Sequence, residues 1–172
     1  MIYEFDGKTP VIDPTAFVSE SATLIGDVIV SAECYIAPNV VIRGDLSQIV
    51  IGEQTAVEDG VIIHVGRKGC RIGKRVTLGH GAIIHGSSIA DGANIGMGAI
   101  LSLSSVVGEY AVVAEGAVVK QGQFVEPKTV VGGMPAKVLR TLEEKDILLW
   151  EKSKDIYVDL AKQCLNGKLK LL

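Results

Sequence analysis

The stretch IADGANIGMGAILSLSSVVGEYAVVAEGAVV, residues 89–119, determines the fold of this chain. Every sixth residue in it is aliphatic, from Ile89 to Val119. The same period runs through the preceding chain, with a three-residue shift after Ile42 and after Ile63 and one step shortened to five residues after Ile84. A period of six fits neither an amphipathic helix nor a long alternating strand, but it suits a short strand followed by a tight turn. The repeated positions upstream are Ile12, Val18, Leu24, Val30, Ile36, Ile42, Ile51, Val57, Ile63, Ile72, Leu78 and Ile84.

The repeat predicts an all-β protein, a parallel β-helix. Three units close a triangular coil of about 18 residues, with the aliphatic residues pointing into the core. The repeat therefore indicates about six coils, which we assign with an exit segment to residues 1–140. A β-sandwich also has short strands and many glycines, but it does not require a strict six-residue phase.

Composition agrees with a narrow aliphatic core, since hydrophobic residues make up 48% of the chain and aromatic residues only 5%. A net charge of −3 argues against a nucleic-acid surface. No apolar run reaches transmembrane length, and the first residues lack the pattern of a signal peptide. Cys34, Cys70 and Cys164 have no Cys-x-x-Cys spacing and read as isolated reduced thiols. These features predict a cytoplasmic protein without a membrane or nucleic-acid partner.

The C-terminal part departs from the repeat. The repeat is predicted to end near Lys120, and residues 122–140 contain prolines and paired glycines that indicate an irregular exit segment. A helix is predicted in residues 141–172, starting at a capping box formed by Thr141 and Glu144. Apolar residues at roughly helical spacing predict that it packs on the prism or on a neighbouring subunit; they are Leu149, Ile156, Leu160 and Cys164.

The phases of the repeat group the polar residues. Arg43, His64 and His85 each follow an aliphatic residue of the same face in successive coils, and Ser102 holds the next such position. They should therefore form a column with steps of about 4.8 Å. In that column His64 and His85 are close enough to bind one metal ion.

His80 belongs to another face, two residues after Leu78, in the column that also holds Asp59. Five or six extended residues separate the two columns by on the order of 15 Å, so His80 should not reach the same ion within one chain. A prism with threefold character packs naturally as a cyclic trimer. We therefore expect a homotrimer in which each metal site takes His64 and His85 from one chain and His80 from the next.

Three neutral imidazoles with an open position suit a catalytic divalent ion, most often zinc, although iron and cobalt are also accepted. Such an ion supplies a hydroxide nucleophile at neutral pH. Arg43 and Asp45 flank the site, as a catalytic pair or as a structural interface ion pair, while Glu58 and Asp59 lie on the His80 face. A lone histidine of a repeat protein is usually a surface residue, but three at compatible phases favour a metal site.

These motifs resemble the γ-class carbonic anhydrase family: Arg43-Gly44-Asp45, Glu58-Asp59-Gly60 through His64, and Gly79-His80 through His85-Gly86. The start and the tail of the chain are similar to a branch that includes phenylacetate-pathway thioesterase-like and carnitine-operon proteins. The resemblance covers nearly the whole chain and implies a left-handed β-helix trimer. It also implies metal ligands at His64, His80 and His85, an interfacial ion pair at Arg43 and Asp45, and a further carboxylate at Asp59.

The chain departs from the archetypal enzyme of this family in two places. Glu58 stands where that enzyme has a glutamine that orients the metal-bound hydroxide, and residues 46–49 lack its acidic loop with a glutamate proton shuttle. The first hypothesis for function is a metal-dependent lyase that reversibly hydrates CO₂. The alternatives are an acyl-CoA thioesterase that uses the same nucleophile and a non-catalytic binding or assembly module clamped by the metal. An acetyl-CoA acyltransferase shares the fold but needs a free histidine base, whereas all three histidines here are assigned to metal.

Overall fold

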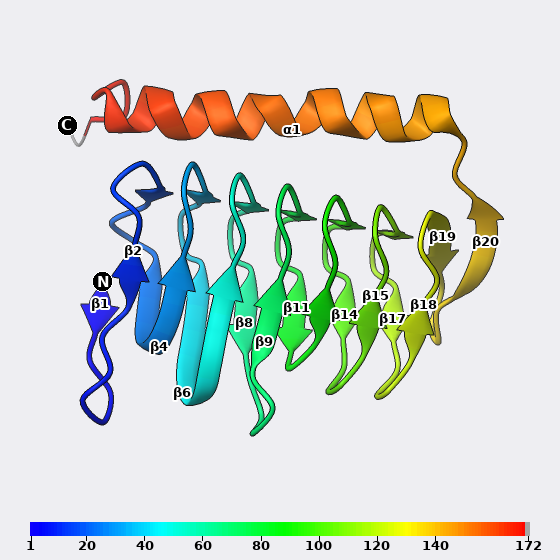
Figure 1. Ribbon diagram of the computed structural model, residues 1–172, viewed down its shortest axis with the longest axis horizontal. Helices are drawn as coiled ribbons and strands as arrows, with labels where there is room; N and C mark the ends of the chain where they lie inside the picture. The colour runs from blue at the N-terminus through cyan, green and yellow to red at the C-terminus, as the bar shows by residue number, and fades with distance from the viewer. Residues whose placement is uncertain (171–172) are drawn as a thin grey trace.

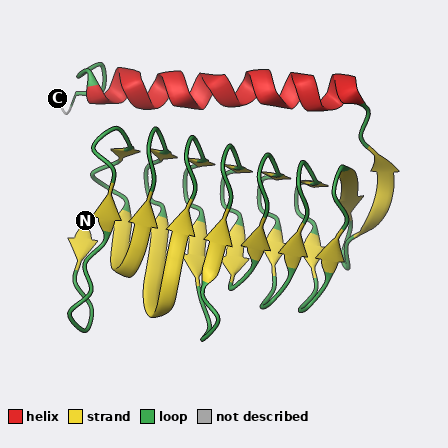
Figure 2. Ribbon diagram, viewed as in Figure 1, coloured by secondary structure: helices red, strands yellow, loops and turns green. Residues whose placement is uncertain are grey.

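The computed structural model describes residues 1–170 and shows a left-handed parallel β-helix of about seven turns with one long helix beside it (Figure 1). The coil is a prism of short strands, and α1 runs along one side of it (Figure 2). The strands are β1 (Ile2–Tyr3), β2 (Val11–Ile12), β3 (Phe17–Val18), β4 (Thr23–Val30), β5 (Tyr35–Ile36), β6 (Val41–Ile51), β7 (Ala56–Val57), β8 (Ile62–His64), β9 (Cys70–Ile72), β10 (Thr77–Leu78), β11 (Ile83–His85), β12 (Ser88–Ile89), β13 (Asn94–Ile95), β14 (Ile100–Leu101), β15 (Val106–Val107), β16 (Val112–Val113), β17 (Val118–Val119), β18 (Phe124–Val125), β19 (Thr129–Gly132) and β20 (Lys137–Thr141).

The three faces of the prism are built by in-register pairing between successive coils. One sheet, in the order β20-β19-β16-β13-β10-β7-β5-β3, forms the second face, while the other two faces belong to a single sheet because β4 and β6 continue around the corner between them. The predicted aliphatic positions form the core: Leu24, Ile42, Ile63, Ile84 and Leu101 are all fully buried in one stack. The six-residue period thus predicted the fold correctly.

The prism is longer than the sequence analysis predicted. The aliphatic period continues past Lys120 through Val125 and Val131, both buried. β18 pairs in parallel with β15 and β19 with β16, so the prediction of an irregular exit segment from residue 122 was wrong. Only β20 departs from the coil, because it turns back to pair antiparallel with β19 and covers the end of that sheet.

The helix α1 spans Glu144–Leu165. Its capping box joins Glu143 and Asp146, so the predicted box of Thr141 and Glu144 was wrong, and Thr141 instead ends β20. The predicted packing face was wrong in part, because Leu149 and Ile156 are exposed, whereas Leu160 and Cys164 are half-buried. Residues 171–172 of the predicted C-terminal segment lie outside the described residues.

The helix packs along its own prism, over β3, β5 and β7. Its buried residues are Lys154, Val158 and Ala161. The Tyr157 ring lies 6.0 Å from that of Tyr35, measured between centroids. The part of the chain that the structure describes has no helix long and apolar enough to cross a membrane.

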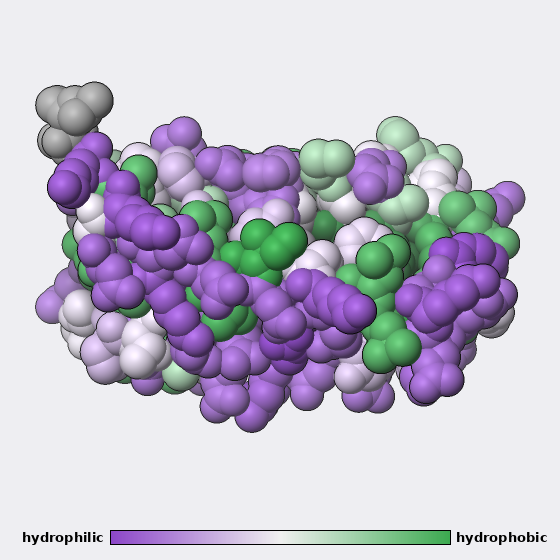
Figure 3. Space-filling model, turned by 90° about the horizontal axis from the view of Figure 1, so that it is seen from above, coloured by the Kyte–Doolittle hydropathy of each residue, from purple (hydrophilic) through white to green (hydrophobic). Residues whose placement is uncertain are grey.

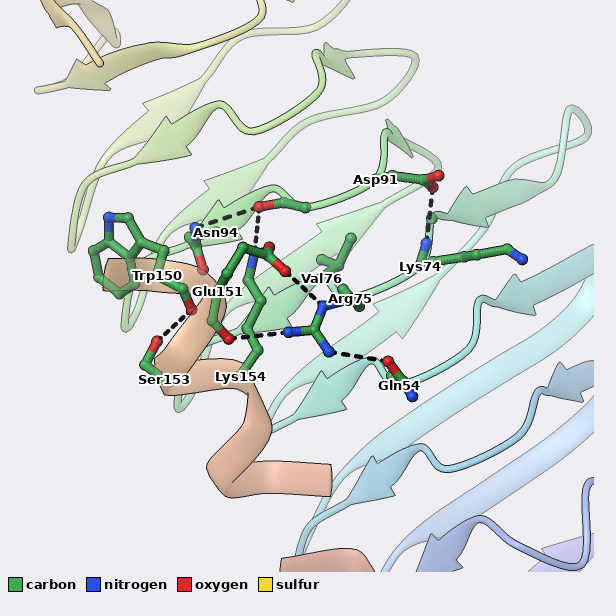
Figure 4. A network of polar contacts seen from close by, with 12 residues as sticks. Gln54, Lys74, Arg75, Val76, Asp91, Asn94, Trp150, Glu151, Ser153 and Lys154 are labelled. Atoms are coloured by element: carbon green, nitrogen blue, oxygen red, sulfur yellow. Dashed lines mark hydrogen bonds and ion pairs between the residues drawn. The ribbon is translucent and has the colours of Figure 1, made fainter. Parts of the chain in front are cut away.

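A polar network fixes the middle of α1 to the corner of the prism that follows β9 (Figure 4). Arg75 Nε donates to Glu151 Oε2 at 2.6 Å, and Arg75 Nη2 donates to Asp155 Oδ1 at 2.9 Å. Lys154, almost fully buried, donates to the Gly92 carbonyl and lies 3.1 Å from Glu151 Oε1. The network anchors one side of the helix to the prism. Trp150 and Tyr157 of the helix line a groove together with His80.

Candidate metal centre

The predicted column of Arg43, His64 and His85 is confirmed by the register of the sheet. Arg43 of β6 pairs with His64 of β8, and His64 pairs with His85 of β11. The two imidazoles stack with centroids 5.5 Å apart and an interplanar angle of 14°. Ser102 follows Leu101, the partner of Ile84, and so continues the column. The regular step between coils brings two imidazoles side by side on the outside of one face.

Asp45 organises the end of this column. Its Oδ1 lies 3.0 Å from His64 Nε2, and its Oδ2 accepts a hydrogen bond from Arg43. Burial works to raise the pKa of Asp45, but the hydrogen bonds from Arg43 and His64 outweigh it and hold the pKa below its ordinary value. Asp45 therefore remains an anion and fixes one ring nitrogen of His64.

His80 lies at the corner between the second face and the face that carries His64 and His85, where the chain turns through left-handed Gly81 with φ 68°. Its Nδ1 is 3.0 Å from Asp59 Oδ2 and its Nε2 is 3.1 Å from Glu58 Oε2. The buried Glu58 carboxylate also accepts the backbone N–H of His80 at 3.1 Å. The predicted grouping of His80 with Asp59 and Glu58 on one edge is therefore correct.

One chain thus holds the predicted site residues in two groups, His64 and His85 with Arg43 and Asp45, and His80 with Glu58 and Asp59. Among residues 1–170, no three metal-binding side chains converge to hold an ion within the chain. The donor chemistry of each group still fits a divalent ion. The stacked imidazoles are outward-facing, and a carboxylate stands beside one ring nitrogen of His64, as is usual for ligand histidines. Both ring nitrogens of His80 contact carboxylates, so the contact of its Nε2 with Glu58 has to open before that nitrogen can hold an ion.

The segment that replaces the acidic loop of the archetypal enzyme is part of a strand. β6 spans residues 46–49, but its pairing with β4 shifts there from Gly26–Gly44 to Val28–Ile49, so residues 45–48 form a bulge without partners in β4. Pairing with β9 begins at Ile49. Leu46 is exposed there, and Ser47 hydrogen-bonds the next corner through Gly66 and Gly69. The edge of the site is therefore a bulge of β6 that offers no side-chain carboxylate at residues 46–49.

Sequence reasoning missed the contribution of α1 to the His80 side. A groove of about 440 Å³ runs between the helix and the second face, with Glu58 and His80 at one end and Trp150 and Tyr157 on the helix side. Burial and the neighbouring Glu58 carboxylate raise the pKa of Tyr157. On the side that carries α1, hydrophobic side chains gather between charged ones (Figure 3). The seven-residue spacing of Trp150 and Tyr157 on one helix was the only signal for this.

Comparison with known proteins identifies the family. No family model matches the chain. A Geobacillus kaustophilus protein named carbonic anhydrase is 39% identical over 160 residues, which cover 92% of this chain and 88% of the relative. The chain belongs to the γ-class carbonic anhydrase-like family of hexapeptide-repeat proteins. Another member, the carnitine operon protein CaiE of Escherichia coli O157:H7, is 38% identical over 164 residues, 94% of this chain and 83% of CaiE.

Solved structures support the same family and fold. A Bacillus cereus protein described as an acetyltransferase superposes with a TM-score of 0.94 at 36% identity, covering 96% of both chains. A hexapeptide transferase family protein of Anaplasma phagocytophilum superposes with a TM-score of 0.91 at 34% identity, covering 98% of both chains. The family and the fold are therefore established, while the names of its members span more than one reaction.

Proposed function

We propose that the protein is a metal-dependent enzyme that reversibly hydrates CO₂ at sites shared between the subunits of a homotrimer. The observation that carries the proposal is the division of the three histidines, with His64 and His85 stacked on one face and His80 at a different edge. The 39% identity to a relative named carbonic anhydrase supports this reaction over the others.

The surface beside the histidine column supports the shared site. Ile62 and Ile83 precede His64 and His85 by two residues, so they point outward with them, and Ile100 continues the row. All three are exposed in the single chain. A contiguous row of β-branched residues next to polar groups is typical of a subunit interface. Closing it with a second copy would bring another chain's His80 edge to this face.

In this proposal His64, His85 and His80 of a neighbouring copy hold a divalent ion, zinc, iron or cobalt. Such an ion supplies a hydroxide nucleophile at neutral pH. Asp45 keeps His64 oriented, and the half-exposed Arg43 guanidinium, paired with Asp45, provides a positive charge for bicarbonate. Glu58, anchored by the His80 backbone, supplies a fixed acceptor that orients the nucleophile. Asp59 fixes the ring of His80.

The test combines metal content with rate. Protein purified anaerobically and loaded with zinc or iron should contain about one ion per chain and hydrate CO₂ above the buffer rate in a stopped-flow assay. His85→Ala and His80→Ala should each lose metal and at least a hundredfold in rate. Ser102→Ala, one step along the same column, is the matched control and should retain both. A trimer that takes up no metal would sink the proposal and favour a binding or assembly role.

Hydrolysis of an acyl-CoA thioester is a second candidate, and one observation favours it. The groove beside His80 has room for an acyl chain and is lined largely by apolar residues, a feature that CO₂ does not require. Zinc-loaded protein should then release free thiol from acyl-CoA esters, and His85→Ala should not. If the protein hydrates CO₂ but releases no thiol from acyl-CoA esters, thioester hydrolysis is excluded.

A further inference from the structure

The groove beside His80 is an elongated site with a defined floor and roof. Its floor is a column of outward-facing residues on the second face, in which Thr77 pairs with Asn94, Asn94 with Val112, and Val112 with Val130. Three steps between coils give a length of about 14 Å. Trp150 and Tyr157 of α1 stand on the opposite side. This shape suits an extended chain-like ligand better than a compact one.

Asn94 is the buried polar residue of that floor. Its side chain is only 5% exposed, and its Nδ2 donates to the Gly92 carbonyl at 3.5 Å. The same carbonyl accepts from Lys154 Nζ (Figure 4). Asn94 Oδ1 is buried and has no hydrogen-bond partner in the described chain. A buried amide oxygen without a donor is unfavourable, and in native proteins such a group usually meets a ligand or water.

The orientation of this amide follows from its neighbours. Exchanging the oxygen and nitrogen of Asn94 would place Oδ1 against the Gly92 carbonyl, and neither oxygen carries a proton. The nitrogen therefore faces Gly92, and the oxygen is left as an acceptor. The Lys154 ammonium donates to the same carbonyl, so this carbonyl accepts from both side chains.

We propose that the groove binds a secondary amide that carries an alkyl chain. The amide N–H donates to Asn94 Oδ1, and the alkyl chain lies along Val112 and Val130. The proposal assigns a ligand class to the groove beside His80. Any turnover of such a ligand rests on the proposed function, but its binding does not. Reaching Oδ1 requires a covering side chain to move, and we assign that movement to Trp150, which lines the groove and is 38% exposed.

The test uses two probes that differ in one group, N-hexylacetamide and its ester isostere hexyl acetate, with metal-stripped full-length protein. Trp150 is the single tryptophan of the chain, so its fluorescence reports on the groove directly. We expect both probes to change the fluorescence and the amide to bind about tenfold more tightly, as one added hydrogen bond to a buried acceptor allows. Asn94→Leu should bring the two affinities together, and Thr77→Val, in the same column, should keep them apart.

Equal binding of amide and ester to wild type would overturn the proposal and would assign Oδ1 to a trapped water. Persistence of the amide preference in Asn94→Leu would overturn it as well, as would absence of binding by both fluorescence and calorimetry. Because binding is measured without metal, its failure is separate from that of the proposed enzyme. If the protein hydrates CO₂ but shows no preference for the amide, only the proposed ligand is wrong. If it prefers the amide but does not hydrate CO₂, only the proposed reaction is wrong.

Discussion

Gly44 is a residue at which neighbouring coils approach closely. A Cβ added there would lie 2.4 Å from the backbone oxygen of Asp27. We therefore expect Gly44→Ala to lower the free energy of unfolding by about 2–3 kcal/mol and to displace Arg43 and Asp45, because backbone has to move. Gly66→Ala is the control, since its Cβ would meet only the end of the Leu103 side chain, at 3.1 Å. Urea unfolding of both variants measures the difference, and equal losses would contradict this reading of the contact.

Lys154 predicts a pH dependence of stability. Burial lowers its pKa below the ordinary value of 10.5, and the contact with Glu151 offsets this only in part. The unfolded chain therefore keeps this proton to higher pH than the folded chain does. The charged Lys154 side chain therefore lowers the free energy of unfolding. This effect is fully present below the pKa of Lys154 in the folded state and disappears as pH rises toward 10.5, the ordinary pKa.

The variant Lys154→Met isolates this effect, because it keeps the apolar stem and leaves Glu151 paired with Arg75. Urea unfolding in this alkaline range should show the wild type gaining stability relative to the variant as pH rises. Parallel curves for the two proteins would contradict a lowered pKa.

At the scale of elements, Arg75 is the main polar anchor of α1. It hydrogen-bonds Glu151 twice, Asp155 once and Gln54 once. Because these bonds are charge-assisted but partly exposed, Arg75→Ala should cost about 1–2 kcal/mol and increase hydrogen exchange along α1. Lys74→Ala removes a neighbouring surface ion pair with Glu53, and we expect it to cost less than about 0.5 kcal/mol. Exchange of α1 that is unchanged in Arg75→Ala would show that apolar contacts alone hold the helix.

The sequence predicted the strands and the histidine column because each repeat must place one aliphatic residue in the core, and this fixes the phase of its neighbours. It failed after Lys120, where Pro127 and the pair Gly132-Gly133 suggested that the coil had ended although Val125 and Val131 keep the phase. Proline at a corner leaves the strands intact.

The helix was harder to place because its buried face is centred on a lysine. Counting apolar residues selected exposed Leu149 and Ile156 and overlooked Lys154, whose burial depends on Gly92 and Glu151. The groove could not be predicted for a related reason. It brings Trp150 near Asn94, and no repeat phase connects residues of the helix to positions on the prism.

At the scale of the whole molecule, the exposed isoleucine row predicts the oligomeric state. Ile83 and Val106 lie on different faces and are similarly exposed, 39% and 40%, so a substitution at Val106 is a matched control for the same substitution at Ile83. If the His64–His85 face is the interface, Ile83→Glu should give a folded monomer without bound metal, because a buried carboxylate opposes association. Val106→Glu should remain a metal-bound trimer. Sedimentation and metal analysis check both, and a trimeric Ile83→Glu variant would place the interface elsewhere.

The return of α1 along the prism affects how the protein is made. The helix starts at the last coil and ends beside the first (Figure 1). At the second coil Lys162 lies 2.8 Å from Glu33, and Tyr157 meets Tyr35. During translation the early coils leave the ribosome well before the helix that covers them. Until then the stacked aromatic pair Phe17 and Tyr35 lacks the cover of the helix. A chain that stops short of residue 144 lacks this helix and leaves the aromatic pair without its cover.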